Sequence, residues 1–438
     1  MQYESAAESA RDSADTEGIY RKVAFRIMPF LMLCYITAYL DRINIGFAKL
    51  RMLKDLGLTD AAYGLGAGLF FIGYLLFEVP SNVLMARIGA KKTISRIMIL
   101  WGLISASFAF VSTPTQFYVL RFLLGVAEAG FYPGIILYLT YWFPSARRAK
   151  MVALFVGAVP LSGMIGAPLS GAIMATLEDA HGFAGWQWLF IIEAIPSLVL
   201  GLLTLALLDD GPVQTGWLSE REKRFIKNEL ELDSRSVAGH AGGMGVWQTL
   251  GNRKVWHMTL ICFCSAICSY GVSFWLPTLI AQLAPNDIFL VGLYTAVPFA
   301  VAFVGMYLIG RSSDNLRERR RHLVVPFLCV STGLVASVFT HSMPTLALAA
   351  LCLAALGAYS TTSMLFSIPG LFLTGVGMAA GVALINCVGG LGGFVSPYVV
   401  GVIKDVTGST DYGVFFISLM ALVGVTLTLL LPKRLVNR

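Results

Sequence analysis

The sequence predicts an all-α membrane protein, with twelve transmembrane helices in two six-helix pseudo-repeats. Three observations lead to this fold class: an excess of apolar residues, twelve long apolar windows, and a loop pattern that recurs at a constant offset. Of the 438 residues, 57% are hydrophobic and 13% are charged, against about 45–50% and about 25% in ordinary soluble domains. A soluble core cannot hide that many apolar side chains.

The twelve windows have the length that a membrane helix needs. A helix requires about 20 largely apolar residues to cross the ~30 Å hydrocarbon layer. Because the windows are continuous rather than alternating, they favour helices over barrel strands, and each helix satisfies its own backbone hydrogen bonds in lipid. The windows are 24–46, 61–83, 95–112, 115–139, 150–173, 187–208, 256–282, 289–310, 323–341, 343–368, 376–402 and 413–432.

A motif between the second and third windows recurs between the eighth and ninth. NVLMARIGAKKT and GRSSDNLRERRR align at one offset of 228 residues. The repeat predicts two halves, 21–208 and 256–432, joined by a polar stretch over 209–255. The matched pairs are Asn82 with Gly310, Ala86 with Asp314, Lys91 with Arg319, and Lys92 with Arg320.

The segments outside the windows are polar. Residues 1–20 are acidic and contain no apolar stretch, which predicts a disordered cytoplasmic tail without a cleavable signal peptide, and 433–438 form a second tail. Within 209–255, Ser219 followed by Glu222 is a capping box that opens an amphipathic helix. We expect that helix to lie along the cytoplasmic face.

The positive charges predict the orientation, because Lys and Arg in short loops stay on the cytoplasmic side. Four such residues fall on the opposite side: Lys49, Arg51, Lys54 and Lys404. Both termini are therefore predicted to be cytoplasmic, in an inner (plasma) membrane. The fifteen residues on the terminal side are Arg87, Lys91, Lys92, Arg96, Arg147, Arg148, Lys150, Arg311, Arg317, Arg319, Arg320, Arg321, Lys433, Arg434 and Arg438.

Several other functions find no support in the residues. The seven cysteines all lie in apolar windows and imply no disulfide framework. His257, Cys264 and Cys268 share a helical face but lack a fourth metal ligand, so no metal and no cofactor are expected. There is no nucleophile–base constellation and no phosphate loop, which argues against an enzyme. The net charge of +7 reflects topology rather than nucleic-acid binding.

The second copy of the loop motif has the form G-x-x-x-D-x-x-x-x-R-R and resembles the cytoplasmic loop of the major facilitator superfamily. The first copy departs from it, with Asn82 for the glycine and Ala86 for the aspartate. Longer stretches over nearly the whole chain resemble the anion:cation symporter family, and the tartrate, phthalate and hydroxyphenylacetate carriers within it. The stretches are YLDRINIGFA, RFLLGVAEAGFYPG, GWQWLFIIEAIPS, YGVSFWLPTLI and GVALINCVGGLGGFVSPYVVGVIKDVTGS. Gly390 stands where that family commonly has asparagine.

Ionisable residues inside membrane helices cost about 2.5–3.5 kcal/mol on insertion scales, so they usually face a cavity and serve a function. All of those found here lie in the first half of the chain. The alternative is a buried ion-pair cluster that holds the bundle together. Glu78 is either a gate or a solvated helix end, and Glu193 has no assigned role. The six residues are Asp41, Arg42, Glu78, Arg121, Glu128 and Glu193.

The resemblance implies roles for these residues. Arg42 would bind the substrate carboxylate through two parallel hydrogen bonds, which a lysine cannot make. Asp41 and Glu128 would accept the coupling proton, with Arg121 as a partner that tunes them. Tyr39, Tyr74 and Asn386 match positions that line the site of sugar-acid carriers. The gating motif would comprise Arg87, Lys91, Lys92, Gly310, Asp314, Arg319 and Arg320.

The expected activity is import of a small organic acid by proton symport, in a monomer that alternates its access. Tyr270 lies 228 residues after Arg42, so a second fixed cation is absent there. That favours a substrate with one anchoring carboxylate and an aromatic or hydroxylated remainder against Tyr270, Phe274 and Trp275. Proton-coupled export of organic anions or drugs is the alternative, a non-transporting sensor is another, and sodium remains open as the coupling ion.

Overall fold

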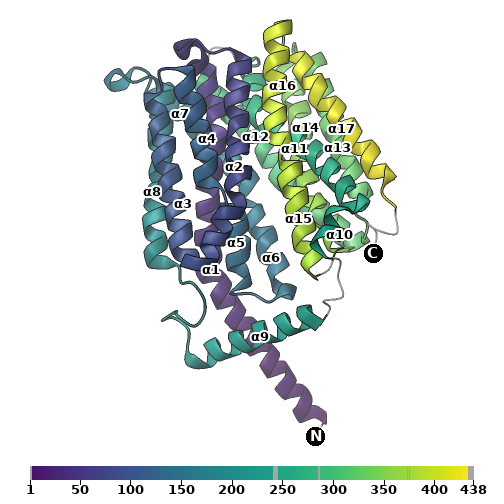
Figure 1. Cartoon of the computed structure of the whole chain (residues 1–438). Helices are drawn as coiled ribbons and strands as arrows, with labels where there is room; N and C mark the ends of the chain where they lie inside the picture. Colours follow the sequence, from purple (N-terminus) through teal and green to yellow (C-terminus); the bar gives the residue numbers. More distant parts are fainter. Residues whose placement is uncertain (1, 240–244, 285–286, 372, 374, 433–438) are drawn as a thin grey trace.

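The computed structural model describes residues 2–239, 245–284, 287–371, 373 and 375–432, which form a bundle of long helices (Figure 1). Twelve helical spans in this part of the chain are long and apolar enough to cross a membrane, which confirms the predicted fold class. The first half contains α1 (Gln2–Leu56), α2 (Asp60–Ile88), α3 (Ala90–Ser107), α4 (Pro114–Glu128), α5 (Phe131–Thr140), α6 (Ser145–Val156), α7 (Ala158–Thr176) and α8 (Gly185–Leu207). The second half contains α11 (Arg253–Ala281), α12 (Ile288–Leu316), α13 (Arg321–Phe339), α14 (Pro344–Leu365), α15 (Gly375–Gly390), α16 (Gly392–Thr407) and α17 (Asp411–Leu430).

The two halves stand side by side in Figure 1, the first in purple to blue and the second in green to yellow. They meet where α2 packs on α16 and where α7 packs on α12. Two glycines permit the second contact, because a Cβ on Gly171 would lie 2.8 Å from the Ile288 carbonyl oxygen and one on Gly292 2.6 Å from that of Ala167. Small residues at such crossings let the two backbones approach closely.

Three of the spans are made of two helices each. The fourth span changes direction at Gly130, which adopts φ 86° and separates α4 from α5. That left-handed conformation suits glycine because it has no Cβ. As a result Glu128 is the last residue of α4 and lies near the middle of its span. The fifth and eleventh spans are divided at Gly157 and Leu391, which keep right-handed dihedrals with φ −58° and −59°.

The start of the chain, where the sequence analysis expected a tail, continues the first helix. The structure places residues 2–20 in α1, as its first turns. Tyr20 is buried, with its ring 6.0 Å from that of Phe143 and 6.3 Å from that of Phe225. The Arg147 guanidinium lies 4.7 Å from the centre of the same ring and pairs with Glu17 at 2.6 Å. These contacts fix α1 at Glu17 and Tyr20 against Phe143, Arg147 and Phe225, partners that a local count of apolar residues does not identify.

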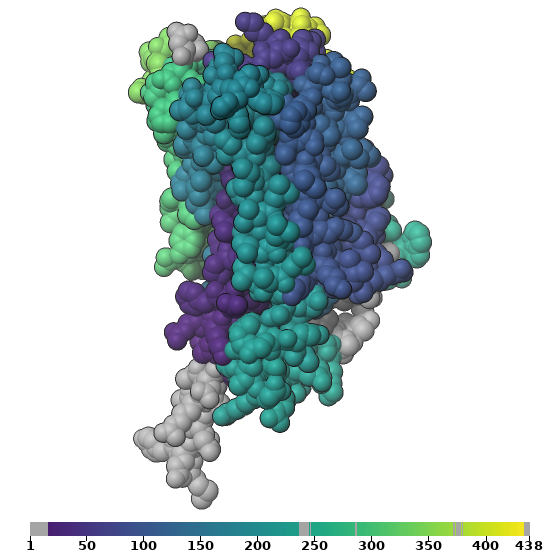
Figure 2. Space-filling model, turned by 90° about the vertical axis from the view of Figure 1, so that its left-hand side faces the viewer, coloured from purple at the N-terminus to yellow at the C-terminus, as the bar shows by residue number. Residues whose placement is uncertain are grey.

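The linker carries α9 (Glu220–Gly239) and the short α10 (Val246–Leu250). The predicted capping box is present: Ser219 Oγ accepts from Glu222 N at 3.3 Å, and Glu222 Oε2 accepts from Ser219 N at 2.7 Å. Lys22 of α1 pairs with Glu222 at 2.9 Å. In Figure 2 α9, in teal, lies below the bundle against the purple part of α1. We refer to this side as the α9 end, and to the other side as the far end.

Candidate functional site

Arg42 and Glu128 form a buried ion pair in the middle of the bundle. Arg42 is in α1 and is 8% exposed, whereas Glu128 ends α4 and is 4% exposed. The Arg42 Nη2 group donates a hydrogen bond to Glu128 Oε1. Its Nη1 group lies 3.5 Å from the hydroxyl oxygen of Tyr270, on α11 of the other half. The guanidinium therefore joins an acid of the first half to a phenol of the second.

Aromatic rings enclose the same guanidinium. Its central carbon lies 4.7 Å from the ring centre of Tyr39, 5.0 Å from that of Phe70 and 5.8 Å from that of Tyr74. Such rings stabilise a cation that has left water. Tyr39, Tyr74 and Tyr270 are partly exposed although they lie at the bundle centre. The structure thus brings together Arg42, Glu128 and three of the four predicted lining residues, around accessible surface between the halves.

Arg121, the predicted tuning partner, is buried in α4 and contacts α2. Its guanidinium donates to the carbonyl oxygens of Gly66 and Ala67 on α2, at 3.3 and 3.4 Å. It also lies 5.2 Å from the ring centre of Phe70, the ring that Arg42 contacts. Arg121 therefore contacts the same aromatic ring as Arg42, and its printed hydrogen bonds go to α2.

Asp41 belongs to a separate polar cluster inside the first half. Its carboxylate accepts from Trp101 Nε1 and Ser105 Oγ, both at 2.7 Å, and from Ser197 Oγ at 2.8 Å. Consecutive residues of a helix point about 100° apart, so Asp41 faces α3 and α8 while Arg42 faces the second half. The two predicted proton acceptors, Asp41 and Glu128, therefore occupy different surroundings.

Asn386 contacts Glu78 rather than Arg42. Its Nδ2 group donates to Glu78 Oε1 at 3.1 Å, and the thiol of Cys387 lies 3.5 Å from Glu78 Oε2. Both partners are on α15, and Glu78 is on α2, 7% exposed. Glu193, which had no predicted role, accepts from Ser170 Oγ at 2.8 Å within the first half.

The predicted gating motif lies at the α9 end, where α2 turns into α3 and α12 into α13 (Figure 1). In the second copy, Arg319 pairs with Asp314 at 2.5 Å, and Arg320 donates to backbone carbonyls of α17. The first copy has Ala86 in place of the aspartate. Here Asp210, just beyond α8, accepts from the backbone N–H of Lys91 at 2.9 Å. Other members of the motif are Arg87 and Lys92, both exposed, and Gly310.

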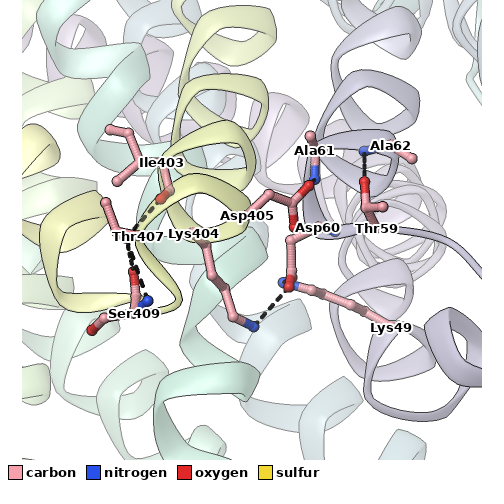
Figure 3. A network of polar contacts seen from close by, with 10 residues as sticks. All are labelled: Lys49, Thr59, Asp60, Ala61, Ala62, Ile403, Lys404, Asp405, Thr407 and Ser409. Atoms are coloured by element: carbon pink, nitrogen blue, oxygen red, sulfur yellow. Dashed lines mark hydrogen bonds and ion pairs between the residues drawn. The ribbon is translucent and has the colours of Figure 1, made fainter.

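A polar cluster at the far end escaped the sequence analysis (Figure 3). Asp60 pairs with Lys49 of α1 at 2.7 Å and with Lys404 of α16 at 3.0 Å. The Asp405 carboxylate accepts from the backbone N–H groups of Asp60 and Ala61, at 3.0 and 2.8 Å. The cluster therefore ties α16 to the first turn of α2.

Lys49, which the sequence analysis placed in an external loop, lies within α1 and is 3% exposed. Its ammonium lies 3.2 Å from the ring centre of Trp275, on α11. Trp275 therefore covers a lysine at the far end. Phe274, also expected in the substrate wall, stacks on Tyr270 with ring centres 6.2 Å apart. The signal that sequence reasoning could have used is the charge pattern just beyond the first window, where Lys49 is followed by Asp60.

Comparison with known proteins agrees with this architecture. The family model described as Major Facilitator Superfamily matches residues 31–397. The chain belongs to this superfamily. It is therefore a membrane transporter and not an enzyme.

Relatives within the superfamily are named for different substrates or phenotypes. The chain is 44% identical to "Putative metabolite transport protein NicT" of Pseudomonas putida, covering 97% of this chain and 96% of that protein. It is 44% identical to a "Putative tartrate transporter" of Agrobacterium vitis, covering 95% and 91%. It is 40% identical to a "Quinolone resistance transporter" of Acinetobacter baumannii, covering 95% of each.

Among solved structures, a bacterial homologue of the human lysosomal transporter Spinster in an inward-facing, occupied conformation superposes with a TM-score of 0.73. The match covers 94% of this chain and 96% of that one, at 16% identity. It supports the fold and carries no argument about the substrate.

Proposed function

We propose that this transporter imports a small organic anion together with a proton. The observation that supports the proposal most is the Arg42–Glu128 pair. Arg42 is a buried cation in the middle of the bundle that faces the second half, and a carboxylate of the protein itself now binds it. A substrate carboxylate can take that place only when Glu128 releases the guanidinium.

This competition couples the proton to the substrate. Protonated Glu128 has no charge to hold Arg42, so the guanidinium is free to form two parallel hydrogen bonds with an incoming carboxylate. When Glu128 loses its proton on the other side, it competes for Arg42 again and favours substrate release. Tyr39, Tyr74, Tyr270 and Asn386 are proposed to surround the remainder of the substrate.

The charge distribution supports a cytoplasmic α9 end. Among the described residues, three groups of Lys and Arg lie there, within 87–96, 147–150 and 311–321, whereas Lys49 and Lys404 lie at the far end. By the positive-inside rule the far end then faces the outside of a plasma membrane. The cluster around Asp60 would close that outer side in the present arrangement.

Export by proton antiport is the second candidate, because one relative is named a quinolone resistance transporter. An antiporter for cationic drugs needs acidic groups facing its ligand. The site instead presents Arg42 among phenols, which favours an anion. The relatives named as tartrate transporters point the same way.

The test is a thermal-shift screen of the purified protein against aromatic, dicarboxylic and sugar acids, followed by uptake of the hits into proteoliposomes. We expect a pH gradient, acidic outside, to drive accumulation of at least one acid. Binding without net movement would indicate a sensor, and efflux against the gradient would indicate the antiporter.

A further inference from the structure

Glu78 lies beside the proposed substrate site, on the path from Arg42 toward the α9 end. It follows Tyr74 by four residues, which places both side chains on one face of α2. The Tyr74 ring is within 5.8 Å of the Arg42 guanidinium, so Glu78 is one helical turn beyond the site. Contact with Asn386 and Cys387 of α15 shows that this face points at the second half.

The surroundings of Glu78 contain mostly neutral groups. Its carboxylate is held by the Asn386 amide and the Cys387 thiol, with the Tyr74 phenol one turn away. On α1 and α4, Arg42 is already paired with Glu128. Four other cations on helices that pack against α2 contact other groups: Arg121 donates to α2 carbonyls nearer the far end, Lys49 and Lys404 pair with Asp60, and Arg96 donates to Ser81 Oγ at 3.3 Å. Lys91 and Lys92 lie in the first turn of α3, at the α9 end.

We propose that Glu78 is a second proton-binding carboxylate of the transport cycle. Its ionised form accepts the hydrogen bond from Asn386 when no substrate is bound, and protonation frees Asn386 to contact the substrate. This inference rests on the proposed function. An ionised Glu78 satisfies the Asn386 amide as a substrate oxygen would, and its charge repels an anion bound one turn away. The anion and the ionised carboxylate therefore exclude each other, and losing the proton toward the α9 end promotes release.

Glu78→Gln tests the proposal, because glutamine retains the oxygen that accepts from Asn386 but has no charge and binds no proton. The measurements are the Kd of an acid found in the screen, between pH 5.5 and 8, and the protons taken up on binding, by calorimetry in buffers of different ionisation enthalpy. At pH 8 the variant should bind the acid about tenfold more tightly, since the like charge is gone. Proton uptake should fall by up to one per substrate, which flattens the dependence of Kd on pH.

Glu193→Gln is the matched control. It neutralises another buried membrane carboxylate, one that contacts Ser170 inside the first half. We expect its Kd and proton uptake to match those of the unaltered protein. Glu78→Asp supplies a second test, since it keeps the charge and should keep the proton uptake.

Each outcome decides a different question. If the unaltered protein binds an acid, and Glu78→Gln shows the same Kd and the same proton uptake, the role of Glu78 is overturned while the proposed function stands. A loss of thermal stability without a change in proton uptake would make Glu78 a structural residue and overturn the inference as well. If the unaltered protein binds none of the acids, the proposed function fails, and the inference fails with it.

Discussion

Asp60→Asn should open the far end of the molecule. Asp60 is the shared partner of Lys49, whose side chain is 2% exposed, and of Lys404, whose side chain is 25% exposed. Asparagine keeps the shape of the side chain but removes the charge. Lys49 then remains buried against Trp275 with no counter-ion at Asp60.

The size of the effect follows from burial. Breaking a buried ion pair costs about 3–5 kcal/mol, whereas the part-exposed pair with Lys404 contributes about 1 kcal/mol or less. When the halves separate, Lys49 and Lys404 both reach water. The cost of leaving Lys49 buried without its counter-ion therefore destabilises only the closed arrangement. A net shift of about 3 kcal/mol changes the ratio of open to closed molecules roughly a hundredfold.

Hydrogen–deuterium exchange followed by mass spectrometry measures this shift without labels. In the variant, peptides covering the start of α2 and the far end of α11 should exchange faster, and peptides at the α9 end of the site should exchange more slowly. Arg51→Met is the control, because Arg51 pairs with Glu178 at 3.0 Å at the same end but within one half. If Asp60→Asn exchanges no faster at the far end than Arg51→Met, the cluster does not hold the halves together. Faster exchange at both ends would indicate general destabilisation instead.

Three further predictions concern the site and the topology. Arg42→Lys should lose most substrate binding, since an ammonium cannot form two parallel hydrogen bonds with a carboxylate; near-normal affinity would refute that role. Glu128→Gln should retain counterflow of substrate in proteoliposomes but lose accumulation driven by a pH gradient, because glutamine resembles the protonated acid and releases no proton. Accumulation that persists would make Glu128 a structural charge. A reporter fused after Arg438 should be cytoplasmic and one in the 178–186 loop external, and finding both on one side would contradict the orientation.

Local sequence was enough to predict much of the architecture. The twelve windows correspond to the twelve spans because crossing lipid requires about 20 apolar residues whatever the helix packs against. The family followed from motifs distributed along the chain, and the capping box at Ser219 followed from residues three apart. Each of these features depends on residues that are neighbours in the sequence.

The pairing of charges depended on the tertiary structure. The sequence showed that Arg42, Asp41, Glu128 and Arg121 were buried in the membrane, but not which of them would meet. Glu128, the last residue of α4 before the break at Gly130, contacts Arg42 of α1. Asp41, adjacent to Arg42, turns away to hydroxyl and indole donors on two other helices.

The sequence by itself determined that this chain crosses a membrane twelve times in two related halves and that its ionisable membrane residues lie in the first half. Only the tertiary structure decided that Lys49 is buried under Trp275 and that Glu78 reaches Asn386. The physical reason is that hydropathy is a local property of each segment. The surroundings of Lys49 and Glu78, in contrast, are completed by Trp275 and Asn386, more than 200 residues away, which only the packing of the two halves brings near.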